Sequence, residues 1–141
     1  MATTRTATTQ WQGSLMTGAG TTSLESSKLA TFDVTWPARA EQPDGRTSPE
    51  ELIAAAHSTC YSMALSHALA GAGNPPENVD TRADVSFQPG EGITGVHLTV
   101  RARVPGLEPD GFRKFAEAAK SDCPVSQALT GTTITLDASL D

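Results

Sequence analysis

The stretch SPEELIAAAHSTCYSMALSHALAG, residues 48–71, predicts a long central helix and decides the fold. Ser48 is a typical cap, Pro49 suits the first helical position, and Glu51 completes a capping box. Gly71 ends the helix, and prolines lie just beyond it. Apolar and small residues recur at helical spacing, namely Leu52, Ile53, Ala56, Cys60, Met63 and Ala64. We therefore expect a largely buried helix of more than 20 residues.

The flanking sequence predicts short strands before this helix and a mixture of strands and helices after it. Turn residues and β-branched stretches mark the boundaries. We expect strands at Thr8–Gly13, Thr21–Ser26 and Leu29–Trp36, a loop over Pro37–Thr47, paired strands at Asn78–Phe87 and Gly95–Val104, helices at Pro109–Lys120 and from Cys123-Pro124 through Leu129, and a final strand at Thr132–Leu136. This order is typical of an α+β protein.

The composition describes one acidic globular domain, residues 1–141. The chain has 141 residues, a formal net charge of −6, 38% hydrophobic and 18% charged residues. An acidic surface disfavours nucleic acid and anionic membranes as partners. The N-terminus lacks the apolar core of a secretory signal, and no apolar run is long enough to cross a membrane. We therefore expect a cytoplasmic protein.

One sequence match points to a nucleotide site that its context does not support. Residues 90–95 read GEGITG and fit the G-x-G-x-x-G pattern of dinucleotide-binding folds. That pattern needs a helix after the glycines, whereas the segment VHLTVRARV that follows is β-branched. We interpret these glycines as a hairpin turn.

The chain has two cysteines, Cys60 and Cys123, which are too few for a disulfide framework or a four-cysteine zinc site. They are either inert buried side chains or chemically active thiols. Cys123 comes just before a predicted helix, where backbone N–H groups lower the pKa of a thiol. Cys60 lies in the middle of the long helix and gains nothing from a helix terminus. A reactive Cys60 would need another stabilising group, and an arginine is the obvious candidate.

Two arginines, Arg39 and Arg46, precede the long helix, and Glu50 is available to hold one of them because Glu51 is used by the capping box. Alternatively, Glu50 only complements the helix dipole. Ten residues of helix rise about 15 Å, so Glu50 cannot lie beside Cys60 of the same straight helix.

His57 precedes Cys60 by three residues and lies on roughly the same side of the helix. It could form a nucleophilic pair with Cys60, or it could be a packed, hydrogen-bonded histidine. A third possibility is a Cys/His metal site that uses Cys60, His57 and Cys123.

Two segments together carry a resemblance to a known family. The stretch RTSPEELIAAAHSTCYSMALS, residues 46–66, and the stretch DCPVSQ, residues 122–127, resemble the OsmC/Ohr family of thiol peroxidases. The closing strand ITLD at 134–137 fits as well, and the resemblance covers nearly the whole chain. The position of Arg39 shortly before the long helix resembles the OsmC branch of that family.

The resemblance implies a fold, an activity and a set of residues. The fold would be OsmC-like, with antiparallel sheets packed around the central helix in an intertwined homodimer. Cys60 would be the peroxidatic thiolate and Cys123 the resolving thiol, while Arg39 would stabilise the thiolate and Glu50 would orient Arg39. The substrates would be organic hydroperoxides and hydrogen peroxide, without metal or organic cofactor. A dithiol reductant, thioredoxin-like or lipoyl-bearing, would reset the disulfide.

The homodimer also accommodates the 15 Å separation, because Arg39 and Glu50 of one chain could serve the cysteines of the other. The alternative to a peroxidase is a non-catalytic module of the same fold that binds a ligand or a metal.

Overall fold

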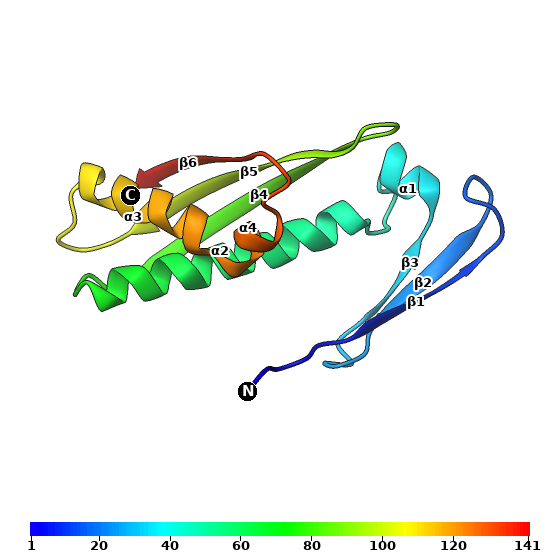
Figure 1. Cartoon of the computed structure of the whole chain (residues 1–141), viewed down its shortest axis with the longest axis horizontal. Helices are drawn as coiled ribbons and strands as arrows, with labels where there is room; N and C mark the ends of the chain where they lie inside the picture. Colours follow the sequence, from blue (N-terminus) through cyan, green and yellow to red (C-terminus); the bar gives the residue numbers. More distant parts are fainter. The chain divides into compact units, whose positions relative to one another are not determined.

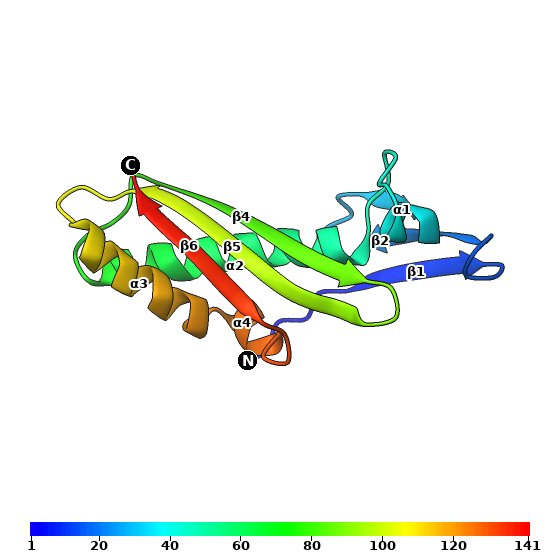
Figure 2. The same cartoon turned by 90° about the horizontal axis from the view of Figure 1, so that it is seen from above.

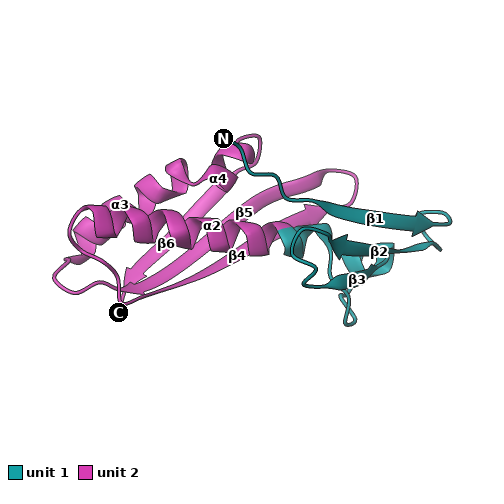
Figure 3. Cartoon of the chain, turned by 90° about the horizontal axis from the view of Figure 1, so that it is seen from below, with its two compact units in different colours: residues 1–52 teal, residues 53–141 magenta.

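The computed structural model describes residues 1–141, with six strands and four helices. The chain divides into two compact units, Met1–Leu52 and Ile53–Asp141, coloured separately in Figure 3.

The first unit is a three-stranded antiparallel sheet followed by a short helix. Strands β1 (Ala7–Gln12), β2 (Ala19–Leu24) and β3 (Thr31–Val34) pair in the order β1-β2-β3. Gly20 permits the close approach of β1, because a Cβ there would lie 2.6 Å from the carbonyl oxygen of Gln10. The three strands confirm the sequence prediction with small shifts of their ends.

Helix α1 (Trp36–Ala40) corrects the prediction of a loop after these strands. Thr35 caps it, and its hydroxyl oxygen accepts a hydrogen bond from the backbone N–H of Ala38 at 3.2 Å. Pro37 fits the first turn, where a missing N–H is not needed. The helix has only five residues and is flanked by proline, glycine and charged residues. It is too short to show the hydrophobic periodicity that predicts a helix from sequence.

Helix α2 (Pro49–Gly71) has the boundaries that the sequence predicts. The hydroxyl of Ser48 accepts a hydrogen bond from the backbone N–H of Glu51 at 3.1 Å, which is one half of the expected capping box. The Glu51 carboxylate is bound instead by the hydroxyl of Thr47 at 2.6 Å. Tyr61, Leu65 and Leu69 follow at intervals of four residues and are fully buried, so one face of α2 enters the core.

The second unit holds a mixed sheet of β4 (Asn78–Gln88), β5 (Gly92–Arg103) and β6 (Ile134–Leu140), in that order. Strands β4 and β5 form an antiparallel hairpin, and positive φ angles of 87° at Gly90 and 98° at Gly92 confirm the predicted turn. Strand β6 runs parallel to β5, which corrects the expectation of antiparallel sheets throughout. Parallel strands need a crossover connection, and helices α3 (Pro109–Asp122) and α4 (Pro124–Ala128) supply it.

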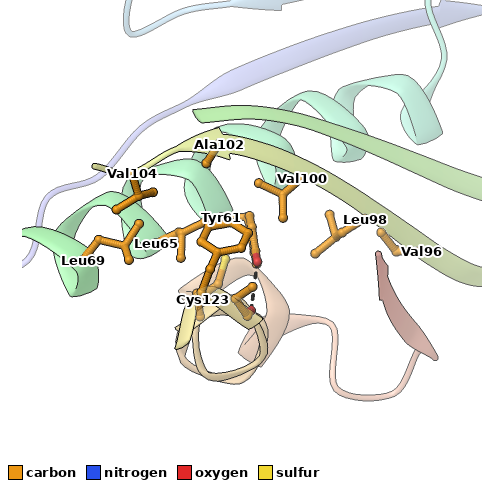
Figure 4. Close-up of a cluster of buried hydrophobic side chains, with 12 residues drawn as sticks. Tyr61, Leu65, Leu69, Val96, Leu98, Val100, Ala102, Val104 and Cys123 are labelled. Atoms are coloured by element: carbon orange, nitrogen blue, oxygen red, sulfur yellow. Dashed lines mark hydrogen bonds between the residues drawn. The ribbon is translucent and has the colours of Figure 1, made fainter. Parts of the chain in front are cut away.

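The core of the second unit lies between this sheet and its helices. Figures 1 and 2 show α2, α3 and α4 on one face of the sheet. The side chains between the two layers are buried and mostly aliphatic. Figure 4 labels Tyr61, Leu65, Leu69, Val96, Leu98, Val100, Ala102, Val104 and Cys123. Phe112, Ala116 and Ala119 complete the cluster. The Tyr61 hydroxyl donates a hydrogen bond to the Ala116 carbonyl oxygen at 2.9 Å, which ties α2 to α3. No helix has the length and apolar character required to span a bilayer.

Candidate active site

The two cysteines, distant in the sequence, meet in the second unit. Cys60 projects from α2 and is partly exposed, whereas Cys123 lies at the junction of α3 and α4 and is fully buried. Both are free thiols, and their side chains form a hydrogen bond with each other. The backbone of Cys123 is held from both sides, because its N–H donates to Ala119 and its carbonyl accepts from Gln127, at 2.9 and 3.0 Å. The arrangement places two thiols where they can exchange with one another.

The surroundings of Cys60 include groups that raise the pKa of its thiol and one group that lowers it. Burial is the largest influence and raises the pKa of the Cys60 thiol, and the neighbouring Cys123 raises it further. A hydrogen bond from the backbone amide of Val125, the second residue of α4, lowers it in part. The expectation that Cys60 gains nothing from a helix terminus is therefore wrong, because the start of α4 reaches it from another part of the chain.

No cation of the second unit contributes to the ionisation of Cys60, whose pKa stays raised on balance. Peroxide is attacked by the thiolate and not by the thiol. The second unit by itself therefore brings the reactive pair together without fully activating it.

Arg39 and Glu50 form a forked ion pair in the first unit. The Nε of Arg39 donates to both Glu50 oxygens at 2.9 and 3.2 Å, and Nη2 donates to Oε1 at 2.7 Å. The Glu50 residue is 7% exposed, so little water competes for its charge. Arg46 has a different neighbour, Asp44, at 3.9 Å on the surface. The contact between Glu50 and an arginine is thus present, and that arginine is Arg39.

A cavity in the first unit adjoins the same arginine. It has a volume of about 220 Å³ and is lined mainly by apolar side chains. Trp11, Leu15, Trp36 and Leu52 contribute to its wall, and Arg39 is the only charged residue there. The combination of an apolar wall and one cation suits a ligand with a hydrocarbon part and a polar end.

His57 and Ser126 form a second buried contact between α2, which carries Cys60, and α4, which begins directly after Cys123. The His57 Nε2 and the Ser126 hydroxyl oxygen are 2.7 Å apart, and both side chains are almost completely buried. The other ring nitrogen, Nδ1, is buried without a hydrogen-bond partner. Burial lowers the pKa of His57, which favours the neutral ring.

This contact agrees with the interpretation of His57 as a packed, hydrogen-bonded residue. Sequence reasoning missed Ser126, although its place three residues after Cys123 puts it within the first turn of α4. No group of three or more His, Cys, Asp or Glu side chains in the chain is arranged to hold a metal ion.

Comparison with known proteins identifies relatives over most of the chain. The family model described as OsmC-like protein matches residues 42–137. The Escherichia coli (strain K12) protein named Peroxiredoxin OsmC is 44% identical over 130 residues, which are 90% of each chain. The Bacillus subtilis protein named Organic hydroperoxide resistance protein OhrB is 28% identical over 102 residues, which cover 71% of this chain and 74% of that one.

Solved structures share the fold. A crystal structure from Legionella pneumophila, described as an organic hydroperoxide resistance protein OsmC, aligns over 96% of both chains with a TM-score of 0.66 and 24% identity. The OhrB crystal structure from Bacillus subtilis aligns over 96% of this chain and 98% of that one, with a TM-score of 0.67 and 23% identity.

Proposed function

This chain belongs to the OsmC-like protein family, and we propose that it is a thiol-dependent peroxidase that reduces organic hydroperoxides and hydrogen peroxide. The observation that carries the proposal is the direct contact of two free thiols, one partly exposed and one buried. The relatives named Peroxiredoxin OsmC and Organic hydroperoxide resistance protein support the same class of reaction. We further propose that residues 1–141 act as a single OsmC-like domain in the cytoplasm.

The proposed chemistry uses Cys60 first and Cys123 second. The Cys60 thiolate attacks the distal oxygen of ROOH, the O–O bond breaks, and the alkoxide RO⁻ leaves and takes up a proton to become ROH. Cys60 is then a sulfenic acid. The Cys123 sulfur attacks the Cys60 sulfur, an S–S bond forms, and the hydroxyl leaves as water with the proton of the Cys123 thiol. A dithiol reductant, thioredoxin-like or lipoyl-bearing, restores both thiols and becomes a disulfide itself.

We assign Arg39 to the stabilisation of the Cys60 thiolate and of the charge that develops on the leaving oxygen. Glu50 would hold the guanidinium in a fixed orientation, because a forked pair fixes both direction and position. This role fits the electrostatics of the second unit, where Cys60 lacks a cation.

We propose that the complete site belongs to a homodimer in which Arg39 and Glu50 of one chain serve Cys60 and Cys123 of the other. The length of α2 supports this arrangement, since Glu50 and Cys60 are separated by about 15 Å of straight helix. The face of α2 that carries Ala55, Ala56, Thr59 and Met63 is exposed, and Met63 is 67% exposed. Small side chains of this kind permit a close helix–helix contact.

The cavity beside Arg39 would receive the hydrocarbon part of an organic hydroperoxide. Its apolar wall gains contact area with an alkyl or aryl group, which hydrogen peroxide lacks. We therefore expect faster reaction with organic hydroperoxides than with hydrogen peroxide.

A peroxide-consumption assay with a small dithiol tests the proposal, with the wild type compared against Cys60→Ser and Cys123→Ser. We expect no turnover with Cys60→Ser. The Cys123→Ser variant should react once and stop at the Cys60 sulfenate, which dimedone traps as an adduct visible by mass spectrometry. Undiminished turnover in Cys60→Ser would contradict the mechanism.

A further inference from the structure

His57 is a polar residue in a buried position where its side chain is unfavourable for stability. It is fully buried, one ring nitrogen has no partner, and the proposed chemistry does not use it. An unpaired polar atom in the interior is unfavourable, and an apolar side chain of similar size would avoid that cost. Its single hydrogen bond, to Ser126, is therefore the feature that distinguishes it from a packing residue.

That bond joins α2, which carries Cys60, to α4, which begins directly after Cys123. His57 lies on α2 three residues before Cys60, and Ser126 lies on α4 three residues after Cys123. Between Cys123 and Ser126 lies Val125, whose amide donates to Cys60. The short segment from Cys123 to Ser126 thus provides the second thiol, the amide and the hydroxyl that His57 binds.

Helix α4 depends on such contacts for its position. It has five residues, and an isolated helix of that length is not stable in water. Pro124 removes one backbone donor at its start. Val125 and Leu129 are only partly buried against the core, whereas Ser126 is 4% exposed and engaged by His57.

We propose that the His57–Ser126 hydrogen bond is a positioning contact that holds the first turn of α4 over Cys60, so that the Val125 amide and the Cys123 thiol both face the Cys60 sulfur. His57 and Ser126 are positioning residues, because they act through α4 and not on the substrate. The expected effect on disulfide formation between Cys60 and Cys123 rests on the proposed function. The expected position of the Val125 amide beside Cys60 does not depend on that function.

The test measures the alkylation of Cys60 by iodoacetamide as a function of pH, in a Cys123→Ser background where Cys60 is the only thiol. Ser126→Ala removes the contact. We expect the alkylation midpoint to move by about one pH unit to higher pH, because the amide that favours the thiolate is no longer held in place. His57→Leu should produce the same movement, and His57→Gln, whose carboxamide can reach Ser126, should restore most of the original midpoint.

Ser62→Ala is the matched control. The Ser62 hydroxyl also makes a 2.7 Å hydrogen bond from α2, but to Thr81 on β4, away from α4. A purely structural role for Ser126 predicts that both variants lose similar thermal stability and keep the same alkylation midpoint. A Ser126→Ala midpoint equal to that of Ser62→Ala, or an unmoved midpoint in His57→Leu, overturns the proposal.

A second readout uses the chain with both cysteines. Graded cumene hydroperoxide is added without reductant, and intact mass separates the disulfide from the Cys60 sulfinate. Ser126→Ala should reach equal amounts of the two products at roughly tenfold lower peroxide than the wild type, because the resolving step is slower. Identical product ratios in the two proteins count against the proposal. If the wild type consumes no peroxide at all, the proposed function fails, and the alkylation midpoints still decide the positioning role.

Discussion

The guanidinium of Arg39 donates hydrogen bonds to the carboxylate of Glu50 through Nε and Nη2, and the shortest, from Nη2 to Oε1, is 2.7 Å. Glu50 is 7% exposed. It lies at the start of α2, so the ion pair fixes Arg39 to the long helix. An arginine held in this way loses little further side-chain freedom when it meets an anion.

Glu50→Gln should lower the second-order rate constant for cumene hydroperoxide about tenfold to a hundredfold. The amide keeps the shape of the side chain but provides a single neutral acceptor, so the guanidinium is less firmly oriented. Stopped-flow measurement of peroxide reduction by the reduced protein checks the effect. Glu51→Gln is the matched control, because Glu51 is exposed and bound by Thr47. An equal loss in both variants would show that the start of α2 matters only for folding.

Arg39→Lys should reduce the same rate constant by about 10²–10³, the usual effect of removing a group that stabilises charge in the transition state. Lysine keeps the charge but cannot make the forked contact. Arg46→Lys should leave the rate constant near the wild-type value, because Arg46 faces Asp44 at 3.9 Å on the surface. A large loss in Arg46→Lys with a normal Arg39→Lys would reverse the assignment of the two arginines.

Mixed dimers test whether the site is shared between chains. Arg39→Gln and Cys60→Ser should each be inactive alone. If the arginine acts on the other chain's cysteines, a mixed dimer has one intact site, and random association should restore about a quarter of the wild-type activity. The two variants are unfolded together in urea, refolded as an equimolar mixture and assayed with a dithiol. An activity equal to the sum of the separate variants would show that Arg39 serves its own chain.

The free energy of unfolding should decrease as the pH drops below about 6.5. In that range the unfolded chain binds a proton at His57, whereas burial keeps the His57 ring neutral in the folded chain. Burial lowers the pKa of His57, so its contribution to stability is complete above that pH and is lost below it. The free energy of unfolding should change with pH by at most about 1.4 kcal/mol per pH unit. Urea unfolding from pH 7.5 to 5 measures it. The slope should flatten in His57→Leu and persist in His67→Gln, since His67 is exposed; equal slopes in both would exclude His57 as the cause.

The boundaries of the long helix were predictable because each end carries its own chemical signal. Ser48 and Pro49 begin it and Gly71 ends it, and these signals act within a few residues of one another. The pairing of β4 with β5 was predictable for the same reason, since a short glycine-containing turn joins them.

The features that the sequence did not reveal depend on contacts between distant segments. The parallel pairing of β6 follows a crossover, and no local pattern states which way a strand returns. The choice between Arg39 and Arg46 was open because both lie a short distance before Glu50. The amide of Val125 on Cys60 and the bond of Ser126 to His57 arise only when α4 is placed against α2. Tertiary packing, and not spacing along the chain, decides all four.

The wide separation of Cys60 and Cys123 along the chain also affects the protein while it is being made. Ribosomes add about 5–20 residues per second, so Cys60 emerges several seconds before the segment that carries Cys123. During that interval Cys60 has no neighbouring thiol and no α4 amide beside it. A nascent chain oxidised at this stage could not form its disulfide and would remain open to further oxidation. The crossover that completes the sheet therefore also marks the moment at which a newly made chain becomes safe from the oxidants it is proposed to remove.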